Sequence, residues 1–146
     1  MIKVGKLAGQ LLMLACVVFL VSCSKRDDGG VPLEPQPPEQ IFKAAEAELA
    51  NKKPKDAAVL FGEVERLYPY SEWAKRGIVM SAFSYHQAKK YDDSRAAAQR
   101  YLDFYPADED AAYAQYLMAL SYYDAIENVA RDQGNTFQAL QSLRVV

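Results

Sequence analysis

The chain has 146 residues with 17 basic and 19 acidic side chains, so its net charge at pH 7 is −2. This balance excludes binding to nucleic acid through charge, which requires a basic surface, and binding to acidic lipid headgroups through charge alone. A single histidine and two cysteines argue against a clustered metal site and against cysteine–histidine catalysis.

The first 22 residues have the organisation of a secretory signal peptide. Lys3 and Lys6 provide a basic start, and an almost uninterrupted apolar run follows over residues 7–21. Spanning a bilayer comfortably takes about 20 apolar residues, more than this run offers. We therefore expect export and cleavage rather than a membrane-spanning helix.

The apolar run closes with Leu20-Val21-Ser22-Cys23, an order that resembles the lipobox of bacterial lipoproteins. The resemblance implies cleavage between Ser22 and Cys23 and a covalent lipid on Cys23, with no other cofactor; the alternative is a cysteine that merely follows an ordinary signal. Removing residues 1–22 also removes Cys16, so the mature chain cannot form an internal disulfide. Loss of Lys3 and Lys6 leaves 15 basic and 19 acidic side chains, a net charge of −4.

Residues 23–38 are predicted to be a lipidated tether. Four of the seven prolines lie in this segment, and proline-rich linkers run extended at about 3.1 Å per residue. Ser24 follows the cysteine, where lipoproteins kept in the inner membrane of Gram-negative bacteria often have aspartate. This resemblance implies an anchor in the outer membrane, with the following domain on the periplasmic face.

Residues 39–146 repeat with a period of 37. Ala45, Ala82 and Ala119 share this spacing, and Tyr68-Pro69 returns as Tyr105-Pro106. Such a period indicates a solenoid of helical hairpins, and each proline is expected to end a helix. First helices are expected over residues 39–52, 71–89 and 108–129, and second helices over residues 55–67, 92–104 and 136 to the end. The predicted fold is an all-α solenoid of about two and a half repeats; the alternative is an ordinary helical bundle.

The small residues of this pattern resemble those of the tetratricopeptide repeat, although Ala98 departs from the bulky position that Phe61 fills. The step from Ser94 to Ala139 is 45 residues instead of 37. The third unit therefore holds eight extra residues, expected to form an elongated helix end and a loop. Because Val146 falls in mid-helix, we expect the chain to be an N-terminal fragment of a longer protein.

A wider resemblance covers residues 20–146. The segments that carry it are Tyr68-Pro69-Tyr70-Ser71-Glu72-Trp73-Ala74, Tyr91-Asp92, Phe104-Tyr105-Pro106, the run from Tyr113 to Tyr123, and Arg131-Asp132-Gln133. Together with the lipobox, the tether and the third-unit insert, they resemble the BamD (ComL-like) lipoproteins of the outer-membrane β-barrel assembly machine. The family has about five repeats. It binds the periplasmic domains of BamA through later repeats and unfolded barrel precursors through earlier ones, so the resemblance implies both partners and the other lipoproteins of that machine.

The first helices of stacked hairpins line a concave surface, and aligning the units on their prolines predicts which side chains point into it. The predicted peptide-binding groove consists of Phe42, Arg76, Phe83, His86, Gln87, Tyr113, Tyr116 and Tyr123. Its aromatic lining suits an extended peptide with aromatic residues, with Arg76 expected to bind a carboxylate. The alternative is that many of these side chains only pack one repeat against the next.

No catalytic or metal-binding residue is predicted, and the chain is expected not to be an enzyme. Ser84 lies within a predicted helix rather than on a nucleophile turn, and a glycine-rich phosphate loop is absent from the sequence. Two rival functions remain: a periplasmic repeat adaptor of peptidoglycan or cell-envelope machinery, and an anchored cell-wall hydrolase that would use a groove glutamate such as Glu46.

Overall fold

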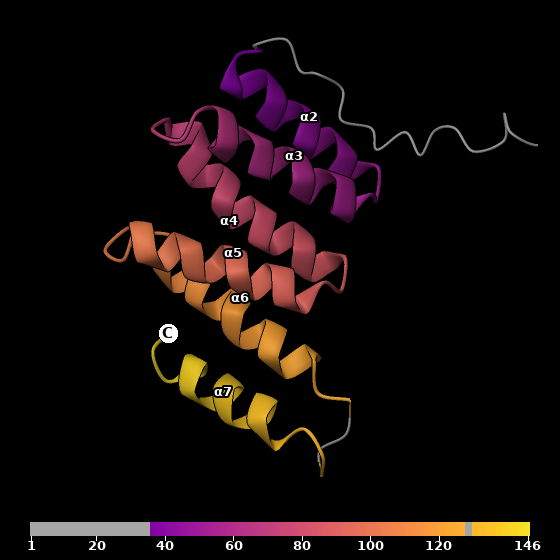
Figure 1. Cartoon of the computed structure of the whole chain (residues 1–146), viewed down its shortest axis with the longest axis vertical. Coiled ribbons are helices and arrows are strands. Elements are labelled where there is room, and N and C mark those ends of the chain that lie inside the picture. The colour runs from indigo at the N-terminus through magenta and orange to yellow at the C-terminus, as the bar shows by residue number, and fades with distance from the viewer. Residues whose placement is uncertain (1–35, 128–129) are drawn as a thin grey trace, which may run out of the picture. The chain divides into compact units, whose positions relative to one another are not determined.

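The computed structural model describes residues 36–127 and 130–146, which form six α-helices and no strand (Figure 1). The helices are α2 (Pro38–Ala50), α3 (Pro54–Leu67), α4 (Glu72–Gln87), α5 (Tyr91–Phe104), α6 (Ala111–Asp124) and α7 (Gln133–Leu143). They pair as three consecutive hairpins, which confirms the predicted all-α hairpin array. Ser22, Cys23 and residues 24–35 of the predicted tether lie outside the described residues.

The helix ends follow from local sequence. Ser71 caps α4, because its side-chain oxygen accepts a hydrogen bond of 3.0 Å from the Ala74 N–H. α3 and α5 end immediately before Tyr68-Pro69 and Tyr105-Pro106, since the residue before a proline disfavours helical backbone.

The prediction that the first helix of the third unit is elongated is wrong. α6 ends at Asp124, one period after the end of α4 at Gln87, so the extra residues fall in the loop before α7. α2 and α4 both end with a lysine in left-handed backbone, Lys52 at φ 60° and Lys89 at φ 57°. The third unit has Ile126 at this position and it does not adopt positive φ, because a β-branched side chain is strained there.

Contacts between helices define two sides of the array. Each helix packs on the next one along the chain, and in addition α2 packs on α4 and α4 on α6. The backbones of α3 and α5 are not in contact, and neither are those of α5 and α7. The first helices of the hairpins (α2, α4, α6) therefore lie close together on an inner side, while the second helices (α3, α5, α7) spread apart on an outer side.

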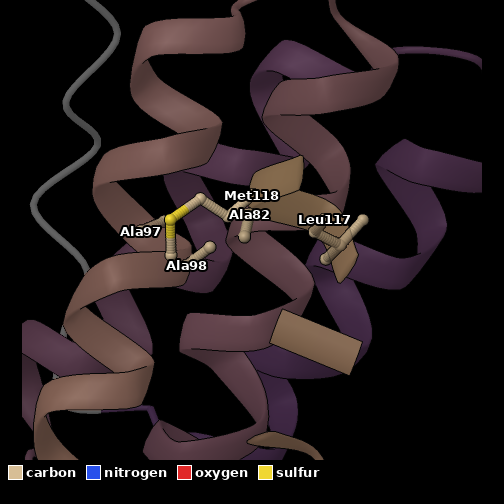
Figure 2. Packing of buried hydrophobic residues seen from close by; sticks show 5 residues of the cluster. All are labelled: Ala82, Ala97, Ala98, Leu117 and Met118. Carbon is tan, nitrogen blue, oxygen red and sulfur yellow. The ribbon is translucent and has the colours of Figure 1, made fainter. Parts of the chain in front are cut away.

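Small residues fill the contacts between helices. Ala45, Ala82 and Ala119 have no exposed surface, which confirms their assignment to the small repeat position. Ala98, the departure from the bulky position of Phe61, packs in one cluster with Met118 (Figure 2). The counterpart of Met118 one period earlier is Ser81. In the first unit the bulky side chain at this contact belongs to the second helix. In the second unit it belongs to the first helix of the following unit.

α4 approaches α3 closely at Gly77. A Cβ atom built on Gly77 would lie 2.9 Å from the backbone oxygen of Phe61, a distance that real Cβ atoms essentially never show. Gly62, on α3, has nothing within 4 Å of its own would-be Cβ. The first glycine is required by packing and the second is not.

A chain of buried hydroxyl groups links α4, α5 and α6. Ser121 Oγ donates to Ser94 Oγ at 2.9 Å, and Ser94 Oγ donates to the carbonyl oxygen of Ala82 at 2.9 Å. One period earlier Ser84 corresponds to Ser121, but Ala57 takes the place of Ser94. The buried oxygen of Ser84 accordingly has no hydrogen-bond partner.

Replacing the two helical glycines should have opposite effects. Gly77→Ala should lower the free energy of unfolding by about 1–3 kcal/mol, because α3 and α4 must move apart. Gly62→Ala should raise it by about 0.5–1 kcal/mol, because alanine loses less conformational freedom in a helix. Urea unfolding followed by circular dichroism measures both, and equal shifts for the two variants would contradict the close approach at Gly77.

The serine chain gives a second matched pair. Ser94→Ala should destabilise the fold by about 1–3 kcal/mol, because Ser121 then loses its buried acceptor. Ser84→Ala should change stability little, since no hydrogen bond is lost. Thermal unfolding of both variants provides the comparison, and a larger loss for Ser84→Ala would refute this account of the buried hydroxyls.

Candidate functional site

Two neighbouring hollows lie along the inner side of the array. The large hollow has a volume of about 640 Å³, between α2, α4 and the turn from α2 to α3; the small hollow, of about 230 Å³, lies between α2, α4 and the start of α6. Glu46 and Met80 line both, so the two hollows adjoin. We call them together the concave groove.

Five of the eight predicted groove residues line these hollows. Phe83 and Gln87 line the large hollow, and Phe42, Arg76 and Tyr113 line the small one. Phe42 is only 2% exposed, so its ring contributes mainly to packing. The repeat alignment thus placed most of the predicted residues on one surface, but it did not reveal how deeply each is buried.

Arg76 lies over aromatic rings. Its guanidinium carbon is 5.0 Å from the ring centres of both Phe42 and Trp73, a cation–π arrangement. Among the described residues Arg76 makes no ion pair, although Glu46 and Asp110 line the same hollow. The guanidinium group of Arg76 is therefore positioned by the rings of Phe42 and Trp73.

His86 connects two helices instead of facing a hollow. Its Nε2 lies 2.9 Å from Asp124 Oδ2 on α6, and its ring centre lies 5.6 Å from that of Tyr91. The His86 side chain is 12% exposed and lines neither hollow. This contact ties α4 to α6 at the end of the groove.

Three predicted tyrosines are exposed on α6. Tyr113 and Tyr116 stack with ring centres 6.4 Å apart, and Tyr123 is the most exposed of the three. Tyr116 occupies the repeat position of Phe42 and Val79, both of which are buried against the following unit. Exposure at this position does not by itself identify Tyr116 as a binding residue.

The sequence analysis missed Met80 and Lys52. Met80 lies one helical turn before Phe83 and lines both hollows, a spacing from which it could have been predicted. Lys52 lines the large hollow because its left-handed backbone turns the chain there from α2 into α3. Helical periodicity contains no signal for such a turn.

A network around Asp108 fixes the start of α6. Tyr101 Oη donates to Asp108 Oδ1 at 2.5 Å, Lys75 Nζ lies 3.0 Å from Oδ2, and the Asp110 N–H donates to Oδ1 at 3.2 Å. These partners, of which Tyr101 has the largest effect, lower the pKa of Asp108 to about 2. Burial raises the pKa of Tyr101, and the bond to Asp108 raises it further. The network joins α4, α5 and α6 beside Tyr113.

The outer side has a hollow that was not predicted. It lies between α3 and α5, has a volume of about 780 Å³, and includes the exposed rings of Tyr70 and Phe104. Arg100 crosses it to form an ion pair with Glu65 at 2.9 Å. Its lining is thus aromatic like that of the concave groove, but it belongs to the second helices.

Within the described residues, no helix is long and apolar enough to cross a membrane. The same part of the chain brings together no group of three or more histidine, cysteine, aspartate or glutamate side chains that could hold a metal ion.

Fold and groove define the class: a helical-hairpin repeat protein with a groove on its inner side. Residues 34–146 match the family model described as YfiO, outer membrane lipoprotein, and the chain belongs to this family. It is 37% identical over 113 residues to the outer membrane protein assembly factor BamD of Caulobacter vibrioides, covering 77% of this chain and 37% of that protein. It is 33% identical over 145 residues to BamD of Rickettsia prowazekii, covering 99% of this chain and 56% of that protein.

These relatives confirm the resemblance on which the sequence analysis relied. The chain spans between about one third and just over one half of the length of the two curated relatives. The similarity to the first covers most of the chain.

The Asp108 network should make the fold sensitive to acid. The pKa of Asp108 lies below its ordinary value of 3.8. The stability that its ionised carboxylate gives the fold is therefore complete above about pH 4 and is lost as pH falls toward 2. Asp108→Asn should therefore be less stable than the wild type near pH 6, and the difference should shrink toward pH 2. Denaturant unfolding between pH 2 and 7 measures this.

Asp103→Asn is the matched control, since Asp103 is an exposed carboxylate that accepts a hydrogen bond from Gln99 on its own helix. The Asp103→Asn substitution should change the free energy of unfolding only slightly at every pH. A stability difference for Asp108→Asn that stays constant down to pH 2 would contradict the assignment.

Proposed function

We propose that this chain is part of a lipid-anchored, non-enzymatic component of the outer-membrane β-barrel assembly machine and serves as a receptor for unfolded barrel precursors. Its lipid on Cys23 would hold it to the outer membrane with the helical domain on the periplasmic face. Its partners would be the periplasmic domains of BamA and the other lipoproteins of the machine. The family membership and the assembly-factor names of two relatives support this proposal.

The observation that carries the receptor role is the concave groove. Leu49, Met80 and Phe83 give it an apolar floor, while Arg76 and Gln87 add isolated polar groups. Extended peptides are commonly held by pockets for alternate side chains. Methionine adapts to side chains of different shape, which suits a receptor that must accept many precursors.

The rival functions have less support. Glu46 and Asp110 both line the small hollow, so a cell-wall hydrolase would have carboxylates available there. Neither relative is named as a hydrolase or as a peptidoglycan adaptor, and we place both functions below the assembly role.

A photo-crosslinking amino acid at Phe83 should label a peptide that corresponds to the C-terminal strand of an outer-membrane barrel, because Phe83 lines the large hollow. The same probe at Tyr116 should also label it if the peptide continues along α6. Gel analysis with a tagged peptide measures the yield.

The control position is Val59, which is 51% exposed on α3 on the outer side. Labelling from Phe83 should clearly exceed labelling from Val59. Equal yields from the two positions would rule out the groove as the receptor surface.

A further inference from the structure

Exposed rings line the hollow of about 780 Å³ between α3 and α5, which we call the outer hollow. Tyr70 is fully exposed and Phe104 is 63% exposed. Their counterparts in the neighbouring units are Ala107 and Leu67, of which Leu67 is half-buried. Packing of the repeat therefore does not require two exposed rings at this place, and unpartnered apolar surface of this kind marks interaction sites.

The wall of the outer hollow contains a glycine that the fold does not need. Gly62 lies in the interior of α3, where glycine is destabilising relative to alanine. It has no positive φ, and nothing lies within 4 Å of its would-be Cβ. Its counterpart one period later is Gln99. Because glycine also lets another backbone approach closely, this position suits an extended ligand that crosses α3.

The first unit shows what the tyrosine of a Tyr-Pro turn binds. Tyr68 Oη donates a hydrogen bond of 2.7 Å to the backbone oxygen of Gln36. Gln36 stands between two prolines in the sequence. Pro37 has φ −51° and ψ 142°, which is polyproline II backbone. The acceptor is thus a carbonyl oxygen of an extended, proline-rich segment.

The equivalent tyrosine of the second unit has no such acceptor. Tyr105 is the counterpart of Tyr68 and lines the outer hollow, and its hydroxyl makes no hydrogen bond with any described residue. The counterpart of Gln36 is Trp73, whose carbonyl lies in the first turn of α4. Contact with the ring of Tyr101, at 5.3 Å between centres, positions Tyr105. The outer hollow therefore contains a positioned hydrogen-bond donor.

Charges in the lining favour an acidic ligand. Arg66 and Arg100 line the outer hollow with one carboxylate, Glu65, and Glu65 pairs with Arg100 at 2.9 Å. Arg66 pairs with Glu63 outside the lining, and the two side chains are 65% and 28% exposed. Because exposed ion pairs contribute little stability, Arg66 can exchange this partner for a carboxylate of the ligand.

We propose that the outer hollow binds an extended, proline-rich segment of a partner protein that carries an acidic side chain. Tyr105 Oη donates to a backbone carbonyl of the segment, whose backbone crosses α3 at Gly62. Its prolines lie against Tyr70 and Phe104, as in other aromatic-lined grooves that bind polyproline II segments, and Arg66 binds its carboxylate. No residue lines both this hollow and the concave groove, so the two surfaces can be occupied together.

The test uses the full-length protein in detergent and a fluorescent peptide, Pro-Pro-Leu-Glu-Pro-Pro-Leu-Glu-Pro-Pro, whose affinity is measured by anisotropy. A second peptide has lysine in place of both glutamates. Gly62→Gln fills the hollow, and its matched control is Gly134→Gln, at another helical glycine with nothing within 4 Å of its would-be Cβ. Tyr105→Phe removes the hydroxyl in the hollow, and its control is Tyr68→Phe.

The acidic peptide should bind the wild type about threefold more tightly than the lysine peptide at low ionic strength, the scale of one exposed ion pair. The difference should shrink at high salt. Gly62→Gln should abolish binding, and Tyr105→Phe should weaken it about fivefold, the scale of one hydrogen bond. Both controls should bind as the wild type does. Circular dichroism checks that each variant keeps the fold.

Other results overturn the proposal. If Gly62→Gln binds the peptide as tightly as Gly134→Gln, the ligand does not lie in the outer hollow. If neither peptide binds at millimolar concentration, the ligand is not a proline-rich segment. If the protein forms a dimer that Gly62→Gln dissociates, the occupant is a second copy. If the peptides bind only after residues 31–35 are replaced by glycine and serine, the occupant is that segment of the chain itself.

Discussion

Close approach of helix backbones is the constraint on which the rest of this structure depends. At Gly77 the backbone of α4 lies so near the carbonyl oxygen of Phe61 that no side chain can come between them. Ala45, Ala82 and Ala119 are without exposed surface at the repeated small position. Because protein interiors are packed nearly as densely as organic crystals, residues of this size fix the distance between neighbouring helices and not merely their order.

The concave groove is a consequence of this spacing. Among equivalent helices of different units, only the first helices of the hairpins have backbones in contact, so the array closes on their side and opens on the other. The floor of the groove is therefore made of side chains on rigid helices whose backbones are held by the small residues behind them. A binding surface built on helices keeps its shape better than one built on loops. The Asp108 network does the same for the start of α6, because it ties Tyr101 and Lys75 from the two preceding helices to one carboxylate.

The period of 37 residues was enough to predict the fold, because it records the size of one packed unit. It placed the prolines after α3 and α5 correctly. The expected elongation of the first helix in the third unit was wrong, because α6 ends at Asp124, one period after the end of α4 at Gln87. For the groove, the period predicted which face of each helix lines it but not how deeply each side chain is buried. Phe42 faces the groove and is nevertheless buried under Arg76, because the contact comes from a helix in the next unit.

Differences between equivalent positions are the most informative part of a repeat protein, because packing alone would keep them alike. Ser81 and Met118 differ, yet Met118 fills the space beside Ala98, so that difference is explained by packing volume. Leu49 and His86 also differ: Leu49 lines the large hollow, whereas His86 contacts Asp124 at 2.9 Å beside a hollow of about 470 Å³ that includes Lys89, Tyr91 and Asp124. An open apolar hollow leaves its lining without partner atoms and loses their dispersion contacts. A ligand that fills the large hollow would supply these missing contacts.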